Sequence, residues 1–319
     1  MEHRLIFIIS APRSGSTVLM RILNAVPGIQ GHPELHLLPP LAHLGLWRTV
    51  EKAPFDALQA RAAMTGIVDV LPGGEADYVA ACRAYADTLY GGLLAGLDEE
   101  ARFLVDKTPA NALVLPELRK LYPEAKVIVL TRHPAAVFVS YAEAFFGGDF
   151  EEAARFNPIL SRYVPAIARF VLEDDGPMLH VTYEQLVAEP EAVLAAVGTF
   201  VGMEIGAEAL AYGAVPVAAG LGDPEASRLR ELKKRPERWP VVLADPVKRA
   251  VVVRQLEGAT AAELGVWGWH LDAVGGEAGR GGGGRLRRRL LVGIRKSVRR
   301  GRRRRLVEQI QDLCAVLLR

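Results

Sequence analysis

Short apolar runs alternate along this chain with longer segments whose apolar residues recur every third or fourth position. Four runs have the length and composition of buried strands: residues 5–10, 103–105, 127–131 and 178–182. Helical spacing marks residues 16–25, 55–64, 78–94, 113–121, 135–146, 157–172 and 190–201. Apolar strands that alternate with helices predict a parallel sheet covered on both faces, an α/β fold.

Ligands of such sheets bind beyond the carboxyl ends of the strands. Two polar segments fall there: the loop around Arg13 after the first strand, and Thr-Arg-His-Pro at residues 131–134 after the third. A further segment, Pro-Glu-Leu-His-Leu-Leu from Pro33, predicts a short helix.

Charge divides the 319 residues into an acidic body and a basic tail. Residues 275–319 carry 13 Arg and one Lys against two Glu and one Asp, a net charge of +11, whereas the remainder carries −9. Residues 275–284 are glycine-rich, as a flexible linker is. We therefore expect a globular domain at residues 1–274, a linker at 275–284 and a basic amphipathic tail at 285–319.

The apolar runs are much shorter than the roughly 20 residues that a membrane-spanning helix needs. The N-terminus does not resemble a cleavable signal. Two cysteines, Cys82 and Cys314, offer neither a disulfide framework nor a metal cluster. These features predict a cytoplasmic protein, with the tail as a possible peripheral contact to a membrane.

The loop after the first strand has the chemistry of an anion site. Backbone N–H groups converge where a strand turns tightly into a helix, and the helix dipole favours negative charge. Ser14, Gly15, Ser16 and Thr17 add a flexible turn and hydroxyl donors, and Arg13 adds a guanidinium. The simpler alternative is a helix capped by Ser16 or Thr17. The Gly-Lys-Ser/Thr ending of ATP-binding loops is missing, which disfavours an ordinary ATPase or GTPase.

The segment Ala-Pro-Arg-Ser-Gly-Ser-Thr, residues 11–17, resembles the 5′-phosphosulfate loop of sulfotransferases that use 3′-phosphoadenosine 5′-phosphosulfate (PAPS). Residues 127–141 resemble the 3′-phosphate motif of the same family, in which a Ser follows a strand-end Arg by eight residues. Arg132 and Ser140 keep this spacing, while His133 replaces the usual Asp. Taken singly, Arg132 could be a structural ion-pair partner and Ser140 a buried helix serine. Together with the first loop they imply a nucleotide with two phosphates.

Three further segments fit the same family. Asp-Lys-Thr-Pro at residues 106–109 resembles a segment in which the lysine approaches the sulfuryl group, and residues 179–202 resemble the strand, Tyr-Glu-x-Leu and helix that follow it. Residues 28–39 resemble the acceptor-side segment of tyrosylprotein sulfotransferases and of sulfotransferases in polyketide assembly lines. The resemblance covers roughly residues 4–270 by motif order, and implies a P-loop-like three-layer fold.

The resemblance implies an in-line sulfuryl transfer to a hydroxyl, with PAPS as co-substrate and no metal. Arg13 would receive charge on the leaving phosphate and Lys107 would stabilise the sulfuryl oxygens. A hydroxyl acceptor needs a general base. Glu34 matches the placement of the proposed base in the tyrosylprotein branch; the alternatives are His36, His32 or a Glu34 that only stabilises a helix N-terminus.

The remaining basic segments are harder to assign. Residues 222–239 occupy the place of a nucleotide-closing loop without matching it, so Arg228 and Lys233 are weak candidates for nucleotide contacts. The tail has the composition to bind an anionic membrane or an acidic carrier protein, or to fold back on the acidic body. Nothing in it indicates specific nucleic-acid binding.

Two other functions stay open. One is a nucleotide or small-molecule kinase of related fold, and the other is a non-catalytic nucleotide-binding protein. For the acceptor, the resemblance leaves peptides on one side and small-molecule, lipid or carrier-bound hydroxyls on the other. We favour the second group, because a secretory tyrosylprotein enzyme would need a signal or membrane anchor.

Overall fold

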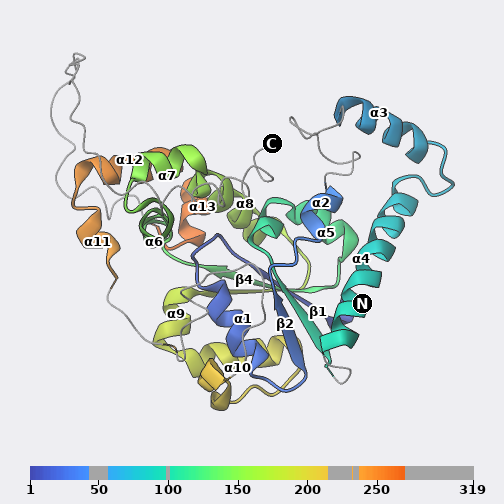
Figure 1. Ribbon diagram of the computed structural model, residues 1–319, viewed down its shortest axis with the longest axis horizontal. Coiled ribbons are helices and arrows are strands. Elements are labelled where there is room, and N and C mark those ends of the chain that lie inside the picture. Colours follow the sequence, from blue (N-terminus) through green and yellow to red (C-terminus); the bar gives the residue numbers. More distant parts are fainter. Residues whose placement is uncertain (43–56, 98–100, 215–231, 233–236, 270–319) are drawn as a thin grey trace, which may run out of the picture.

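The structure, a computed structural model, describes residues 1–42, 57–97, 101–214, 232 and 237–269. Five parallel strands form one sheet in the order β2-β3-β1-β4-β5, and helices cover both of its faces (Figure 1). The strands are β1 (Leu5–Ile9), β2 (Ile29–Pro33), β3 (Phe103–Lys107), β4 (Lys126–Thr131) and β5 (Met178–Thr182). The expected three-layer α/β fold is confirmed.

Strand β1 lies in the middle of the sheet and alternates its side chains between two cores. Leu5, Phe7 and Ile9 point into the larger core, and Ile6 and Ile8 into the smaller one. All five are fully buried. A strand that is buried on both faces reads as a continuous apolar run, which is why the sequence located it.

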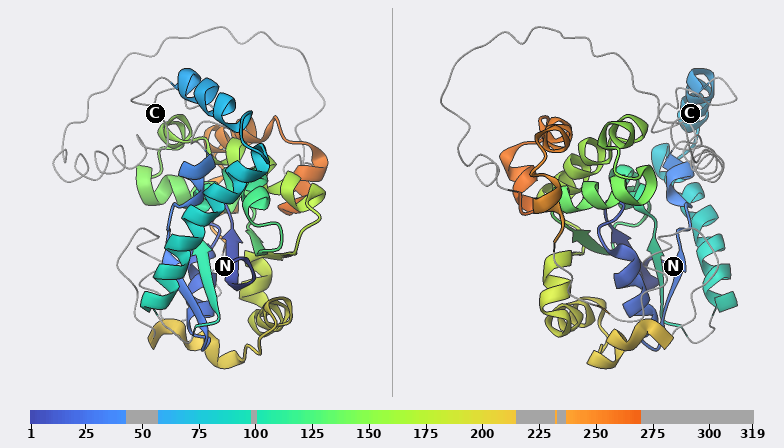
Figure 2. Two further views of the ribbon diagram at one scale, coloured as in Figure 1. Left: turned by 90° about the vertical axis from the view of Figure 1, so that its right-hand side faces the viewer. Right: turned by 60° about the vertical axis from the view of Figure 1, so that its left-hand side comes forward.

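The smaller core lies under one helical layer and the larger core under the other (Figure 2). The first layer consists of α1 (Ser16–Asn24), α9 (Tyr183–Ala188), α10 (Pro190–Val201) and the 3₁₀ segment η3 (Ala207–Ala214). The second consists of α4 (Glu75–Leu97), α5 (Leu115–Leu121), α6 (Pro134–Phe146), α7 (Phe150–Phe156), α8 (Ile159–Glu173), α12 (Pro246–Leu256) and α13 (Ala261–Val266). Shorter elements are η1 (Glu2–Arg4), α2 (Leu38–Ala42), η2 (Pro109–Leu113) and α11 (Trp239–Val242), and α3 (Ala57–Val68) precedes α4.

One expected element is wrong. The sequence predicted a helix from Pro33, but Ile29–Pro33 is the edge strand β2, and residues 34–37 have no regular structure before α2 begins at Leu38. Gly31 and Pro33 make this strand difficult to recognise in the sequence, because glycine and proline are uncommon in strands. The Pro33 position is tolerated because β2 is an edge strand that pairs only with β3.

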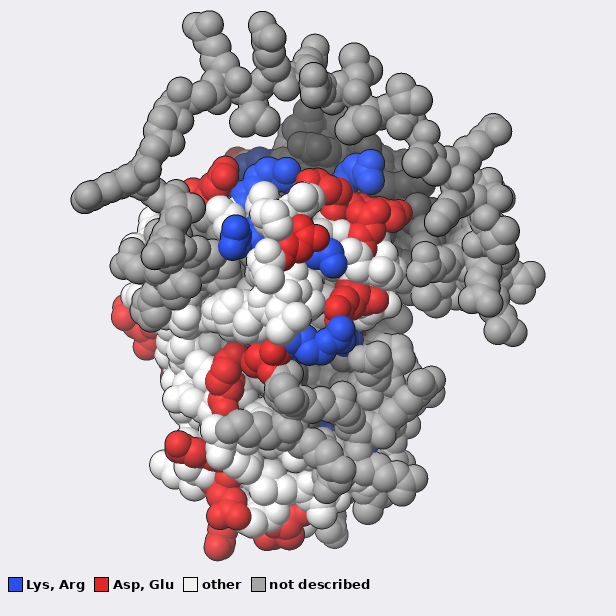
Figure 3. All heavy atoms as spheres, turned by 90° about the vertical axis from the view of Figure 1, so that its left-hand side faces the viewer, with Lys and Arg blue, Asp and Glu red and all other residues white. Residues whose placement is uncertain are grey.

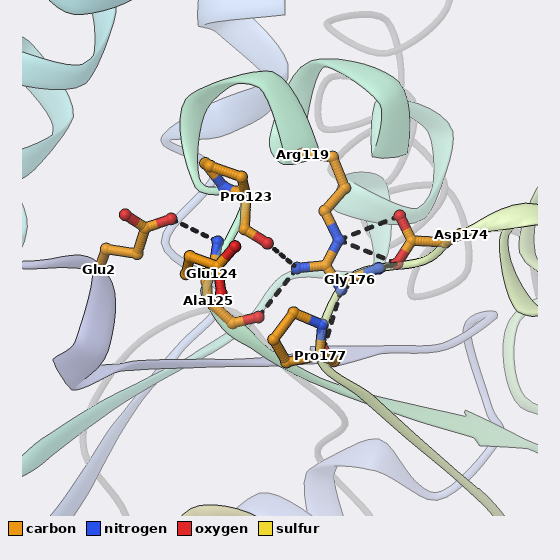
Figure 4. A network of polar contacts seen from close by, with 8 residues as sticks. All are labelled: Glu2, Arg119, Pro123, Glu124, Ala125, Asp174, Gly176 and Pro177. Carbon is orange, nitrogen blue, oxygen red and sulfur yellow. Dashed lines mark hydrogen bonds and ion pairs between the residues drawn. The ribbon is translucent and has the colours of Figure 1, made fainter.

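The amino edge of the sheet is held by Arg119 of α5 (Figure 4). Its guanidinium donates to both carboxylate oxygens of Asp174 at 3.0–3.1 Å, and to the carbonyl oxygens of Pro123, Ala125 and Pro177 at 2.9–3.1 Å. These carbonyls belong to the segments that lead into β4 and β5. One side chain thus aligns two neighbouring strands at the edge opposite to the polar loops.

The face on the left of Figure 1 mixes acidic and basic side chains in its upper part, and its lower part shows mainly acidic ones (Figure 3). No helix within the described ranges is long and apolar enough to cross a membrane. The linker at 275–284 and the basic tail at 285–319 lie outside the described residues, as do Arg228 and Lys233. Their assignments stay predictions.

Candidate active site

The loop between β1 and α1 turns in a conformation that few residues adopt. Arg13 and Gly15 have φ angles of +70° and +93°, in the left-handed region. Gly15 is the N-cap of α1, and no side chain makes the capping hydrogen bond. The simpler alternative, in which Ser16 or Thr17 caps the helix, therefore fails. The Val18 amide in the first turn of α1 donates to the Gly15 carbonyl oxygen at 2.9 Å, while the amides of the first residues of a helix have no acceptor within the helix, so an anion is favoured at this N-terminus.

Gly15 is required by more than its φ angle. A Cβ at this position would overlap Cδ2 of Tyr183, the first residue of α9. The Tyr183 ring also lies 4.4 Å from Cζ of Arg132, a cation–π contact. Tyr183 follows β5 directly, so the carboxyl ends of three strands, β1, β4 and β5, meet at this ring.

The two resemblance segments contact each other. Arg13 Nε donates to Ser140 Oγ at 3.2 Å, and Arg132 Nη1 donates to the Arg13 carbonyl oxygen at 3.4 Å. Ser140 lies on α6, two turns after Arg132, as the spacing predicted. The structure thus brings Arg13, Arg132 and Ser140 to one place on the carboxyl edge.

Several buried polar atoms at this place have no partner within the described part of the chain. They include Ser14 Oγ and Arg132 Nε. Ser14 is fully buried. Arg132 also has Nη2 at 3.3 Å from both carboxylate oxygens of Glu237. Since unpaired buried donors are costly, this arrangement is suited to an anionic ligand.

His133, which replaces the usual Asp, packs as an aromatic residue. Its ring stacks on Trp239 with centroids 4.1 Å apart and lies 5.1 Å from Trp269. Its backbone N–H donates to Glu184 Oε1 at 3.1 Å. Burial, and secondarily the Arg132 guanidinium, lower the pKa of His133 to about 4. The ring is therefore neutral near pH 7 and adds no charge beside Arg132.

The second cluster lies at the ends of β2 and β3. Pro33 and Lys107 are paired in register as the last residues of their strands. Glu34, the next residue of the chain, accepts a hydrogen bond from Lys107 Nζ at 2.7 Å. The side chain of Lys107 is only 1% exposed and that of Glu34 19%. Lys107 is thus a buried cation and not a surface lysine.

His36 completes this cluster. Its Nε2 lies 3.4 Å from Glu34 Oε2, on the oxygen that Lys107 does not take. A helix from Pro33 would point the Glu34 and His36 side chains in different directions, but residues 34–37 have no regular structure and the two side chains meet. Helix α2 begins four residues after Glu34, so Glu34 is not a helix N-terminal carboxylate. The structure describes the backbone of His32 within β2 but not its side chain.

Opposing effects set the charge of Glu34. Burial raises the pKa of this carboxyl, but the hydrogen bond from His36 and the Lys107 ammonium lower it more, so that its pKa lies below the ordinary value. Glu34 is consequently ionised at neutral pH. A carboxylate with a lowered pKa is a weak base, and as a general base it must lie within hydrogen-bond distance of the proton that it accepts.

The two clusters are neighbours because of the strand order. Strand β1 lies between β3 and β4, and adjacent strands are about 4.8 Å apart. The loop with Arg13 therefore lies between the Glu34–Lys107 pair on one side and Arg132 on the other. Sequence reasoning missed Tyr183 and Thr108 as parts of this site; the only signal was their presence in two of the segments that resemble the family.

Known proteins of one family resemble this chain. Residues 5–207 match the sequence profile of the sulfotransferase family. The nodulation protein NoeE of Sinorhizobium fredii is 35% identical over 134 residues, which are 42% of this chain and 30% of NoeE. A putative protein-tyrosine sulfotransferase of Caenorhabditis briggsae is 26% identical over 206 residues, 63% of this chain and 66% of that protein.

The chain thus spans less than two thirds of the length of these relatives. Among solved structures, the sulfotransferase domain of the Synechococcus PCC 7002 olefin synthase superposes with a TM-score of 0.48 at 24% identity, and covers 79% of this chain and 93% of that domain. Because the profile matches well over half of the residues, the chain belongs to the sulfotransferase family.

Proposed function

We propose that this protein transfers the sulfuryl group of PAPS to a hydroxyl acceptor, with Glu34 as general base. The observation that carries the proposal is the Glu34–Lys107 pair at the carboxyl ends of β2 and β3, beside the anion loop of β1. A base, a buried cation and an anion loop in adjacent strand ends are the groups that an in-line transfer between two oxygens requires.

The nucleotide half of the proposal is supported by the donors around Arg13. The α1 N-terminus and the Arg13 guanidinium would bind the 5′-phosphosulfate, and Arg132 with Ser140 the 3′-phosphate. The unpartnered Ser14 Oγ and Arg132 Nε fit such a ligand, since phosphate oxygens would satisfy both. Because His133 is neutral where the family usually has an Asp, position 133 does not neutralise the positive charge of Arg132.

The transfer half assigns one task to each side chain. Glu34 would take the proton of the acceptor hydroxyl as the new O–S bond forms. The S–O bond to the 5′-phosphate breaks, and Arg13 with the α1 amides would stabilise the charge on this leaving group. Lys107 orients the Glu34 carboxylate at 2.7 Å and would neutralise negative charge between the two. His36 supports Glu34 from the other oxygen.

The acceptor is proposed to be a hydroxyl on a small molecule, a lipid or a carrier-bound intermediate. Residues 28–39 resemble segments of assembly-line sulfotransferases, which supports this choice. They equally resemble tyrosylprotein sulfotransferases, and a relative is described as a putative protein-tyrosine sulfotransferase, which supports a peptide acceptor. A screen of lipid, small-molecule and peptide hydroxyls with ³⁵S-labelled PAPS separates the classes. Transfer to tyrosine peptides alone would overturn the choice.

The base is tested by Glu34→Gln. We expect turnover to fall by about 10²–10⁴-fold, the usual contribution of a general base, while calorimetry finds nearly unchanged affinity for adenosine 3′,5′-bisphosphate. Glu191→Gln, exposed at the start of α10, is the matched control and keeps full activity. Full activity of Glu34→Gln would remove Glu34 from the mechanism.

The nucleotide half is tested separately by Arg132→Ala. Loss of a charged hydrogen-bonding partner should weaken binding of adenosine 3′,5′-bisphosphate by about 10- to 100-fold. Arg254→Ala, which removes an exposed partner of Glu151 on α12, should not change it. Thermal stabilisation by ATP–Mg²⁺ but not by the bisphosphate would instead favour a kinase.

A further inference from the structure

His36 is held in an uncommon backbone conformation by a side chain outside the proposed machinery. Its φ angle is +51°, in the left-handed region that non-glycine residues seldom occupy. Its backbone N–H donates to Thr108 Oγ1 at 3.1 Å. Backbone strain of this kind persists only where surrounding contacts enforce it, and this hydrogen bond is such a contact.

The Thr108 hydroxyl accepts a hydrogen bond from the His36 backbone N–H, because its own proton is used in a hydrogen bond to Asp106. Thr108 Oγ1 donates to Asp106 Oδ1 at 2.7 Å. A hydroxyl has one proton and two lone pairs, so a hydroxyl that donates to Asp106 presents a lone pair to the His36 amide. Thr108 and Asp106 are both completely buried, so their side chains are shielded from bulk solvent.

Asp106 is fixed in turn from the core. The Tyr90 hydroxyl on α4 donates to Asp106 Oδ2 at 2.7 Å. Burial raises the pKa of Asp106, and the hydrogen bonds from Tyr90 and Thr108 act in the opposite direction. Two donors, one on each oxygen, give this carboxylate a single orientation. The chain of contacts runs from a core helix, through the end of β3, to the segment after β2.

This series of contacts determines where the His36 ring lies. With the backbone turned at His36, its Nε2 lies 3.4 Å from Glu34 Oε2. Among the described residues, the charged and titratable groups that shift the pKa of Glu34 are Lys107 of β3 and His36. Asp106 in turn interacts electrostatically with His36. Loss of the His36 contact would leave Lys107 as the main partner of the carboxylate.

We propose that Thr108 is a positioning residue for the base: anchored by Asp106 and Tyr90, it holds His36 against Glu34 and thereby sets the orientation and proton affinity of the Glu34 carboxylate. The inference deepens the proposed function. It rests on that function in one respect, because it takes Glu34 to be the general base. The series of hydrogen bonds that ends at His36 does not depend on which group is transferred.

The test compares Thr108→Val with Thr108→Ser in the full chain. Valine keeps the branched shape and loses the hydroxyl, whereas serine keeps the hydroxyl. The first readout is the pKa of the Glu34 carboxyl, from ¹³C NMR with ¹³Cδ-labelled glutamate, assigned by the signal missing in Glu34→Gln. We expect Thr108→Val to raise this pKa, because a hydrogen bond that lowers it is lost, and Thr108→Ser to leave it near the wild-type value.

The second readout is turnover against pH. In Thr108→Val the acidic limb of kcat should move to higher pH by the same amount as the Glu34 pKa. At its plateau kcat should fall by about three- to tenfold, the value of one hydrogen bond, with little change in KM for PAPS. A merely structural role would lower the melting temperature without moving the pH profile.

A double variant provides the last check. His36→Asn should raise the Glu34 pKa as Thr108→Val does, and the two together should add nothing further, because both break one chain of contacts. Thr108→Ala replaces the valine variant if the latter does not fold. An unchanged Glu34 pKa in Thr108→Val, or an equal rise in Thr108→Ser, overturns the proposal.

The NMR readout also separates this proposal from the proposed function. It needs no turnover, so a chain that sulfates no acceptor can still show the expected pKa changes. In that case the sulfotransfer proposal fails while the positioning role stands.

Discussion

The two halves of the carboxyl edge balance their charges in different ways. At the ends of β2 and β3, Glu34 and Lys107 neutralise each other at 2.7 Å within the protein. At the ends of β1 and β4, Arg132 is paired only loosely, with Glu237 at 3.3 Å, and Ser14 Oγ and Arg132 Nε are buried without a partner in the described structure.

This difference indicates different roles. A region that satisfies its own charges is pre-organised, and its geometry does not wait for a ligand. A region with unmatched donors is stabilised by the ligand that it binds, since buried polar groups need partners. The β2/β3 side therefore suits reaction chemistry and the β1/β4 side suits binding of an anionic nucleotide.

The largest expected effect is on the self-balanced side. Lys107→Met leaves the Glu34 carboxylate, 19% exposed, without its cation. We expect the free energy of unfolding, from urea denaturation, to fall by about 3 kcal/mol, and activity to be lost. Lys120→Met is the matched control: its ion pair with Glu75 has a similar length, 2.6 Å, but both side chains are about half exposed, so the change should stay below about 1 kcal/mol.

A second substitution should restore much of this loss. In Lys107→Met/Glu34→Gln no unpaired charge remains, and stability should recover while activity does not. Equal losses in the Lys107 and Lys120 variants would show that burial does not distinguish the two pairs.

Tyr90→Phe tests the support beneath the same side. Removing the hydroxyl leaves Asp106 Oδ2 buried without its donor, which should cost about 1–2 kcal/mol of unfolding free energy. Tyr85→Phe, on the same helix with 55% of the residue exposed, should change stability by less than about 0.5 kcal/mol. A Tyr90→Phe protein as stable as Tyr85→Phe would mean that Asp106 has another donor.

A pH-dependent effect is expected from His133 on the binding side. Its pKa of about 4 lies below the ordinary value of 6.5, so between these pH values the unfolded chain binds the proton and the folded chain does not. The free energy of unfolding therefore falls as the pH is lowered from 6.5 to 4. In His133→Asn this part of the decline should vanish, which chemical denaturation at several pH values will measure. An identical slope in both proteins would contradict the assigned shift.

The smallest effect concerns Glu237, the partner that Arg132 has in this structure. Glu237→Gln removes a competitor for the guanidinium, so affinity for adenosine 3′,5′-bisphosphate should rise a few-fold, equivalent to about 0.2–1 kcal/mol, and more at low salt. Glu143→Gln, which faces Arg238 instead, should have no effect. Weaker binding in Glu237→Gln would assign Glu237 a supporting role.

The three inner strands β1, β3 and β4 could be predicted from the sequence because they are largely apolar runs buried on both faces. The partly buried edge strand β5 was also located from its sequence, so four of five strands were found. The exception, β2, contains a glycine, a histidine and a proline and lies at the edge, so neither composition nor alternation marks it. A helix at Pro33 would separate the side chains of Glu34 and His36, whereas the irregular segment after β2 brings them together.

Site residues were predictable where a motif carries them and not where only packing does. Arg13, Arg132 and Ser140 were named because their segments resemble two motifs of one family, and they meet in space. Thr108, Tyr90 and Asp106 act through three-dimensional hydrogen bonds between α4, β3 and the segment after β2, and no local pattern encodes such contacts. Arg228 fell outside the described residues and stays a prediction.

Tyr183 lies between the loop after β1 and the loop after β4, which are proposed to bind the two phosphates. One edge of its ring fills the space where Gly15 lacks a side chain, and its face lies against the Arg132 guanidinium. The ring is thus a spacer whose thickness sets the gap between the β1 and β4 loops. In the proposed nucleotide site, recognition of two distant charged groups on one molecule depends on the distance between the two loops. A single aromatic side chain at the start of α9 sets that distance.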